Sequence, residues 1–247
     1  MCPTQGQTLR SDAMTESVHT ALDESVVHTV IDDGKANALT HEVLAAVHEG
    51  LDLAEAERVP IVIEGRPGRF SAGFDLAVIQ SGPEEARGIV RAGADLALRI
   101  FEFPHPVVLG CTGHAVAMGA ILLLAADVRV GGAGEFKIGM NEVAIGLPLP
   151  VFATELARDR LSKRHFLHAT NHARLYAPDE AVDAGYLDEV VPLDQVGEAS
   201  IRQARALADA LQPDAFVATR VNVRSAVAEF IRSTLDADLI RFTAGMA

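Results

Sequence analysis

Two segments, VIEGRPGRFSAGFDL (62–76) and VLGCTGHAVAMGAILLL (108–124), follow the same pattern. Each begins as an apolar strand, continues through a turn of small residues, and ends in a sequence typical of a helix. The start of a helix leaves backbone N–H groups without intrahelical acceptors, so such a turn can bind an anion. If the fold brings the two turns together, two N–H donors can converge on one oxygen atom and form an oxyanion hole.

Small side chains at both turns leave the backbone open to a ligand. The same residues would equally allow a helix to pack tightly on its strand, and the pattern alone does not separate these two interpretations. Neither turn matches GxGxxG or GxxxxGKS/T, which argues against a nucleotide-phosphate loop. The small residues are Ser71, Ala72, Gly73, Ala117, Gly119 and Ala120.

Outward from these turns, the chain up to about residue 150 alternates strand, turn and helix. That order predicts parallel strands joined by crossover helices, an α/β fold. Beyond residue 150 the pattern becomes mostly helical, with Pro178 at the start of one helix and Gly185 at its end. We therefore expect three regions, which are a flexible polar arm over 1–20, an α/β core over 21–193 and a helical region over 194–247.

Composition limits the classes of function. Hydrophobic residues make up 49% of the 247 residues, enough for a large core, and the net charge of −13 argues against nucleic-acid or anionic-membrane partners. The apolar run 115–126 ends at Asp127, too early to span a membrane. The histidines and the two cysteines show neither metal-ligand spacing nor a disulfide framework. Residues 1–20 lack the apolar core of a signal peptide, so a reducing, cytoplasmic setting is expected.

Four segments together resemble the crotonase (enoyl-CoA hydratase/isomerase) superfamily. GRFSAGFDL (68–76) is similar to the first oxyanion motif of that family, and GHAVAMGAILLLAADVRV (113–130) is similar to the second. GKANALT (34–40) resembles the segment after the family's first strand, and APDEAVDAGYLDEVVP (177–192) resembles a later helix–strand element. The resemblance covers roughly residues 22–215, in the order and at the spacing of the family.

The resemblance implies the ClpP/crotonase fold, a spiral of β-β-α turns with a C-terminal helical region that trimerises, giving a homotrimer or a dimer of trimers. It implies a bent coenzyme A thioester as substrate, with no cofactor besides that coenzyme A. The thioester oxygen would lie between the backbone N–H groups of Phe74 and Met118. Family members usually have Gly where this chain has Met118, but any residue other than Pro keeps the N–H donor. By the same resemblance the substrate-binding residues are Lys35, Ala36, Ala72, Gly73, Asp75, Leu76, Gly119, Ile121 and Asn141.

The segment FKIGMNEVAIGLPLP (136–150) contains one carboxylate, Glu142, among mostly apolar residues. Removing an ionised carboxylate from water is costly unless it is paired or its pKa rises. Hydratases of the resembled family use two glutamates, and their positions in this chain are Ile121 and Glu142. Glu142 is therefore the candidate acid/base, and its usual partner is replaced by an apolar side chain.

The loss of one glutamate favours one reaction over another. Addition of water to a C=C bond needs groups that orient and deprotonate the water, whereas migration of a double bond needs a single base and an oxyanion hole. The segment 138–150 also resembles the mitochondrial-type Δ3,Δ2-enoyl-CoA isomerases, which carry an Asn-Glu pair and an apolar residue at the other position. The sequence thus predicts a single-glutamate enoyl-CoA isomerase, in which Asn141 lines the pocket beside Glu142.

Two alternatives stay open. One is an enoyl-CoA hydratase, or another crotonase-type acyl-CoA reaction, in which Glu84, Glu85 or Asp95 occupies the place left by Ile121. The other is a non-catalytic acyl-CoA-binding or scaffold subunit.

Three groups of residues have a structural interpretation beside a functional one. Asp75 fits the cap of a helix start better than a chemical role. Lys35 and Arg69 can reach coenzyme A phosphates or be surface charges. The apolar stripe near the C-terminus is more typical of core or a subunit interface than of an acyl pocket; it comprises Phe230, Ile231, Leu235, Leu239 and Phe242.

Overall fold

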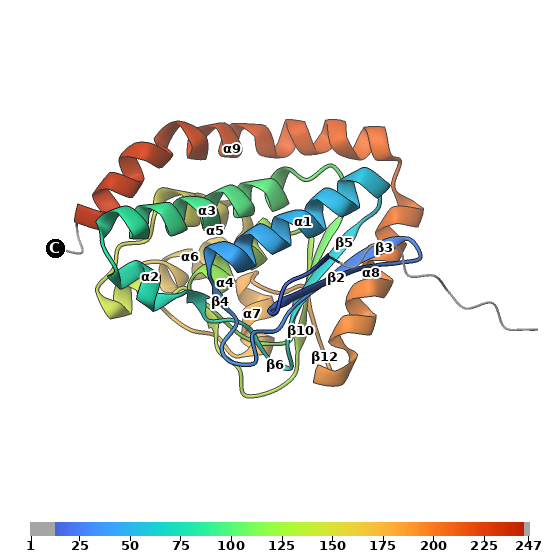
Figure 1. The fold of residues 1–247 in the computed structure, drawn as a ribbon, viewed down its shortest axis with the longest axis horizontal. Helices are drawn as coiled ribbons and strands as arrows, with labels where there is room; N and C mark the ends of the chain where they lie inside the picture. Colours follow the sequence, from blue (N-terminus) through green and yellow to red (C-terminus); the bar gives the residue numbers. More distant parts are fainter. Residues whose placement is uncertain (1–12, 245–247) are drawn as a thin grey trace, which may run out of the picture.

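The computed structural model describes residues 13–244 (Figure 1). Its main sheet has seven strands in the order β1-β2-β3-β5-β8-β10-β12. The strands from β3 to β12 are parallel, while β1 and β2 pair antiparallel at one edge. The strands are β1 (Ala13–Met14), β2 (Val18–Asp23), β3 (Val26–Ile31), β5 (Ile61–Gly65), β8 (Val107–Cys111), β10 (Val128–Gly132) and β12 (Glu189–Val191).

The prediction of a flexible arm over residues 1–20 was wrong for the second half of that range. Residues 18–23 form β2, which pairs with β3 through six residue pairs. The physical reason is an alternating pattern, because Val18 and Thr20 are buried whereas His19 between them is exposed. The Thr20 hydroxyl also forms a 3.0 Å hydrogen bond with the Thr29 hydroxyl across the pair. Residues 1–12 of the predicted arm lie outside the described residues.

Three successive β-β-α units each add one strand to this sheet and one strand to a smaller, three-stranded sheet. β5, β8 and β10 are followed by β6 (Gly68–Ser71), β9 (Gly113–Val116) and β11 (Ile138–Gly139), which pair in the order β11-β9-β6. The two-residue strands β4 (Ala38–Leu39) and β7 (Gly73–Phe74) pair with each other in a third, two-stranded sheet. A helix follows each turn, so the expected spiral of β-β-α turns is confirmed.

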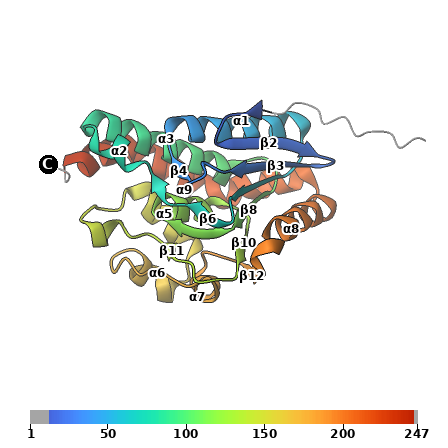
Figure 2. The same cartoon turned by 60° about the horizontal axis from the view of Figure 1, so that its bottom comes forward.

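Alternate residues of the parallel strands face two hydrophobic clusters. Val27 and Ile63 belong to the larger cluster with helices α1, α3 and α4, while Val62 and Val130 belong to the smaller cluster with α8. Figure 2 shows α8 on the opposite side of the sheet from α1. Strands buried on both faces explain the continuous apolar runs in the sequence. These helices are α1 (His41–Glu57), α3 (Pro83–Glu102), α4 (Met118–Ala125) and α8 (Val196–Ala210).

The helix ends follow the expected chemistry. Thr40 caps α1 by accepting a hydrogen bond from the Val43 N–H. Asp75 caps α2 through a 2.9 Å bond from the Ala77 N–H, so its structural interpretation is confirmed. Gly185 ends α7 in the left-handed conformation. The remaining helical elements are α2 (Leu76–Gln80), η1 (Glu142–Ile145), α5 (Val151–Arg160), α6 (Lys163–Ala169), α7 (Pro178–Ala184), η2 (Leu193–Gln195) and α9 (Pro213–Ala244).

The last helix, α9, runs along α3 and crosses the top of the molecule in Figure 1. Ile231, Leu235 and Leu239 are buried against the core, which accounts for most of the apolar stripe, while Phe230 remains 49% exposed. Arg220 and Arg224 in its first half donate to the carboxylate of Asp127. Within residues 13–244, no helix is long and apolar enough to cross a membrane.

Candidate active site

A cavity of about 160 Å³ lies among the two small-residue turns, the segment around η1 and the end of α9. The side chains that the described part of the chain contributes to its wall are apolar, apart from the adjacent Asn141 and Glu142. The wall residues are Ala72, Phe74, Leu76, Ile79, Val90, Ala117, Ile121, Asn141, Glu142, Ile145, Leu147, Pro150, Phe152 and Phe242.

A buried asparagine shapes the first turn. Asn37 has a φ of +52°, and its side-chain amide donates to the carbonyls of Ile31, Arg69 and Phe70. The carbonyl of Asn37 accepts from the Ser71 hydroxyl at 2.8 Å. The same hydroxyl oxygen accepts from the Gly73 N–H at 3.1 Å. This chain of bonds fixes the backbone just before Phe74.

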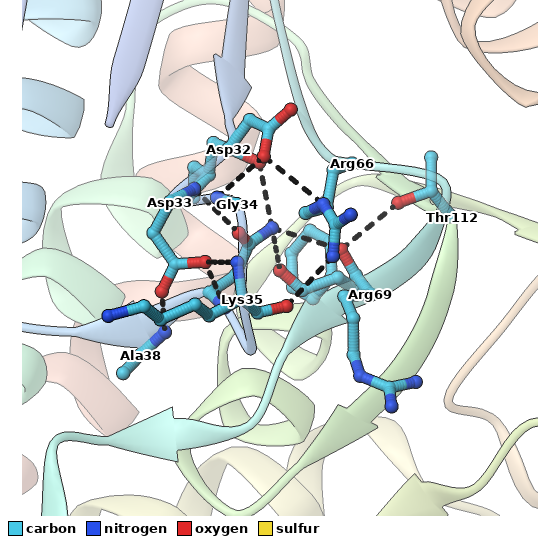
Figure 3. A network of polar contacts seen from close by, with 11 residues as sticks. Asp32, Asp33, Gly34, Lys35, Ala38, Arg66, Arg69 and Thr112 are labelled. Atoms are coloured by element: carbon cyan, nitrogen blue, oxygen red, sulfur yellow. Dashed lines mark hydrogen bonds and ion pairs between the residues drawn. The ribbon is translucent and has the colours of Figure 1, made fainter. Parts of the chain in front are cut away.

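The carboxylate of Asp33 organises the loop before Asn37 (Figure 3). Burial alone would raise the pKa of Asp33, but the backbone N–H groups of Asn37, Lys35 and Ala38 outweigh burial and lower the pKa. The guanidinium of Arg66 donates to the Lys35 carbonyl at 2.9 Å. The loop backbone is therefore held from two sides, while the Lys35 side chain stays exposed.

The two turns lie against each other. Strand β6 of the first pairs with β9 of the second. A Cβ atom added to Gly73 would lie 2.9 Å from the Ala117 Cβ and 3.3 Å from the Met118 nitrogen. A Cβ atom on Gly119 would lie 2.6 Å from the Ser71 carbonyl oxygen. Only glycine fits at both places. The two turns are therefore in direct contact, as the sequence predicts.

The second turn is strained at Ala117, which has a φ of +51° and a ψ of −125°. Such a conformation costs a non-glycine residue on the order of 1–3 kcal/mol, and residues of this kind cluster at active sites. Met118 is the first residue of α4, so its N–H has no acceptor within the helix. The Met118 side chain is buried and, with the Phe74 ring, packs close to Gly93 of α3. Met118 is not among the residues that line the cavity.

Glu142 begins η1 and is only 8% exposed. One of its carboxylate oxygens, Oε2, is buried without a hydrogen-bond partner among the described residues. Burial raises the pKa of Glu142 to about 7, against the opposing effect of the backbone N–H groups of Glu142 and Asn141. A carboxyl group with such a pKa can both accept and return a proton near neutral pH.

No second carboxylate joins Glu142 in the cavity wall, as far as residues 13–244 show. Ile121 lines the wall and is 2% exposed. Glu84 and Glu85 lie exposed in the first turn of α3, and Asp95 is exposed at a different pocket. The candidates for a replacement carboxylate therefore lie outside the cavity.

The structure brings together much of the predicted site. Ala72, Phe74, Leu76, Ile121, Asn141 and Glu142 line the cavity. Gly73, Met118 and Gly119 are buried where the turns meet. Lys35, Ala36 and Asp75 are not among the lining residues, and Asp75 serves as a helix cap. The roles predicted for these residues toward a substrate stay predictions.

Sequence reasoning missed the apolar half of the wall. Ile79, Val90 and Phe152 come from three different helices, and an apolar side chain has the same sequence pattern whether it lines a cavity or fills a core. The sequence favours core or a subunit interface over an acyl pocket for Phe242, although the family resemblance allows both, and the structure places Phe242 in the cavity wall. No sequence feature distinguished Phe242 from its buried neighbours in the stripe.

A model of the enoyl-CoA hydratase/isomerase family matches residues 22–244 of this chain. Among solved structures, an enoyl-CoA hydratase/isomerase family protein from Pseudomonas syringae superposes with a TM-score of 0.88 at 38% sequence identity. The match covers 95% of this chain and 100% of the other.

Two curated relatives carry different names. Enoyl-CoA delta isomerase 1 of human mitochondria is 29% identical over 211 residues, which cover 83% of this chain and 70% of the relative. A Bacillus subtilis protein named "Probable enoyl-CoA hydratase" is 29% identical over 198 residues, covering 78% and 74%. Equal identities to proteins with both names leave the reaction to be argued from the cavity.

Proposed function

The chain belongs to the enoyl-CoA hydratase/isomerase family, and from that premise we propose that it moves the double bond of a 3-enoyl-CoA thioester to the 2-position. Glu142 acts as the acid/base of this reaction. No cofactor is needed besides the coenzyme A that forms part of the substrate.

The reaction has two proton transfers. The Glu142 carboxylate removes a proton from C2 of the thioester, and the negative charge moves onto the thioester oxygen. The N–H groups of Phe74 and Met118 stabilise that enolate by hydrogen bonds. The carboxyl group of Glu142 then gives its proton to C4, so the double bond lies between C2 and C3. The number of protons is unchanged, and Glu142 returns to its starting state.

One observation carries the choice of isomerase, namely that Glu142 is the only carboxylate of the described cavity wall. A hydratase must hold a water molecule while one group removes a proton from it, and Ile121 offers no polar atom for that task. An isomerase benefits from an apolar wall, because exclusion of water keeps the proton on Glu142 for return to the substrate and raises the pKa of the carboxyl.

The contacts that we propose for the rest of the substrate are those that the family resemblance implies. Ala72, Gly73 and Leu76 contact the thioester end from the first turn, and Ala36 contacts it from the loop before β4. Gly119 contacts it from the second turn, and Asn141 contacts it from the position just before η1. Lys35 and Arg69 provide positive charge for the coenzyme A phosphates. We further propose a homotrimer or a dimer of trimers in the cytoplasm, without nucleic-acid or membrane partners.

Hydration is the second candidate, and the hydratase name of the Bacillus subtilis relative favours it. It requires a water held by Glu142 together with Asn141, the other polar side chain that residues 13–244 contribute to the wall. A non-catalytic acyl-CoA-binding subunit would bind thioesters without converting them.

The test measures conversion of 3-hexenoyl-CoA to the 2-enoyl product for wild type, Glu142→Gln and Glu135→Gln. Glu135 is an exposed glutamate of the same loop region and serves as the matched control. We expect Glu142→Gln to lose activity by a factor of about 10² to 10⁴ and Glu135→Gln to keep it. For wild type, kcat/KM should rise with pH to a plateau above about pH 7, because only ionised Glu142 removes a proton.

The proposal fails if wild type does not isomerise 3-hexenoyl-CoA, or if Glu142→Gln is as active as wild type. Faster hydration of crotonyl-CoA than isomerisation would assign the hydratase reaction instead. Binding without conversion would assign the non-catalytic role.

A further inference from the structure

The cavity beside Glu142 has an apolar end that the thioester chemistry does not use. Ile79 and Val90 line it from α2 and α3, and Phe152 lines it from α5. Such a wall offers no hydrogen bonds, so the group that fits it is a hydrocarbon chain. In an enoyl-CoA this group is the acyl tail beyond the reacting carbons.

One residue of this wall comes from the last helix. Phe242 of α9 is 5% exposed and lines the cavity, although the other wall residues lie within positions 72–152. Helix α9 packs along α3, which contributes Val90 to the same wall. The Phe242 ring is thus in a position to limit how far a tail can extend.

Polar contacts hold the end of α9 in place on both sides of Phe242. The buried carboxylate of Asp238 accepts a hydrogen bond from the Val151 N–H, which is the first residue of α5. The guanidinium of Arg87, in α3, donates to the Thr243 hydroxyl at 3.0 Å. Because α9 is tied to α3 and α5, a longer tail cannot easily displace Phe242.

The size of the cavity gives the length of the chain that fits. At about 160 Å³ it is close to the ~150 Å³ cavity that binds benzene in another protein, so it accommodates roughly six carbon atoms. The carbons next to the thioester lie at the oxyanion turns and occupy part of the same space. Counted from the thioester carbon, an acyl chain of about six carbon atoms therefore fills this volume.

We propose that Phe242 closes the acyl pocket and makes this protein specific for short- and medium-chain enoyl-CoA thioesters. This inference rests on the proposed function for its substrate, and it adds the length of the acyl chain and the residue that sets it. Phe242 is a specificity-determining residue that contacts the tail and takes no part in proton transfer.

The experiment compares kcat/KM for 3-enoyl-CoA substrates of 6, 8, 10, 12 and 16 carbons. We expect wild type to lose at least tenfold between 8 and 16 carbons. Phe242→Ala should raise the ratio of the 16-carbon value to the 6-carbon value at least tenfold, because it removes the ring that stops the longer tail. Phe230→Ala changes an exposed phenylalanine of the same helix and should keep the wild-type profile.

Phe242→Leu distinguishes an effect on the accepted tail length from an effect on folding. Leucine keeps an apolar side chain at this position, but the side chain is smaller than that of phenylalanine. An intermediate profile with an unchanged melting temperature supports the proposal. A wild type that accepts 16 carbons as well as 6, or a Phe242→Ala profile identical to wild type, overturns it.

Binding of saturated acyl-CoA thioesters distinguishes failure of this inference from failure of the proposed function. If no substrate is isomerised, the proposed function fails, but calorimetric Kd values for hexanoyl-CoA and palmitoyl-CoA still test the pocket. At least tenfold tighter binding of hexanoyl-CoA by wild type, with this preference lost in Phe242→Ala, supports the length limit. Equal Kd values in wild type overturn it.

Discussion

Glu142 combines two properties that normally exclude each other, burial and ionisation. The carboxyl group is 8% exposed, and burial raises its pKa to about 7. Since its ordinary pKa is 4.5, the folded protein binds a proton there more tightly than the unfolded chain does. The contribution to stability is therefore fully present below about pH 4.5 and is lost as the pH rises through about 7.

Glu142→Gln should consequently stabilise the protein at alkaline pH. Glutamine has nearly the same shape and never ionises, so the variant does not bear the cost of a buried negative charge. We expect a gain of about 3 kcal/mol in the free energy of unfolding at pH 8 that largely disappears near pH 5. Urea denaturation at the two pH values measures it. An equal difference at both would show that ionisation of Glu142 is not responsible.

The sequence predicts the site residues that have a distinctive chemical type, but it does not predict which apolar residues line the cavity. Glu142 stands out in an apolar segment, and Gly73 and Gly119 stand out in turns, so their chemistry can be inferred from sequence. Phe242 has no such mark, because the same side chain serves a core, an interface or a pocket. Only the path of α9 across the molecule decides between these roles.

At the scale of elements, the contact between the two turns depends on Gly73. Its φ is +90°, and a Cβ atom there would lie 2.9 Å from the Ala117 Cβ. The turns belong to β7 and α4, which are far apart in sequence and in close contact in the fold. A side chain at Gly73 would push the two predicted N–H donors apart.

Gly73→Ala should therefore lower kcat at least a hundredfold, since loss of one oxyanion donor alone costs about 10² to 10³. Gly68→Ala is the matched control, because Gly68 has a similar φ of +84° but a Cβ atom there would meet nothing within 4 Å. Both variants carry the same kind of backbone strain, and only the first forces the turns apart. Steady-state kinetics on both variants, with melting curves, tests this, and equal activities would contradict it.

Most elements could be predicted from periodicity and caps, and the exceptions have physical causes. The caps at Thr40, Asp75 and Gly185 are side-chain or glycine features that sequence records directly. Strand β2 was missed because it lies near the sheet edge, where only alternate residues are buried and the segment is polar overall. The short strands β4, β7 and β11 have two residues each, too few for a periodic pattern.

At the scale of the whole molecule, an ion cluster fixes α9 to the core. Asp127, between α4 and β10, accepts hydrogen bonds from Arg220 and Arg224, and all three side chains are at most 14% exposed. The same carboxylate accepts from the Val107 N–H at 2.8 Å. The cluster holds the first half of α9 against the core.

Asp127→Asn should lower the free energy of unfolding by about 3–5 kcal/mol, because it leaves two buried guanidinium groups without a counter-charge. Glu102→Gln breaks another ion pair of α9, with Arg232, whose side chain is 54% exposed, and should cost less than about 1 kcal/mol. Urea denaturation of both variants gives the comparison. A loss in Glu102→Gln as large as that in Asp127→Asn would show that burial of the cluster is not what matters.

Because Phe242 belongs to α9, the acyl pocket receives its last wall residue late in biosynthesis. The oxyanion turns and Glu142 leave the ribosome well before this helix does. At several to twenty residues added per second, the interval lasts from about five seconds to twenty. In that interval Glu142, the proposed acid/base, lies beside apolar wall residues that Phe242 does not yet cover. Chaperones that bind exposed apolar surface would therefore meet this chain at the acyl pocket, and the arrival of α9 would end that exposure.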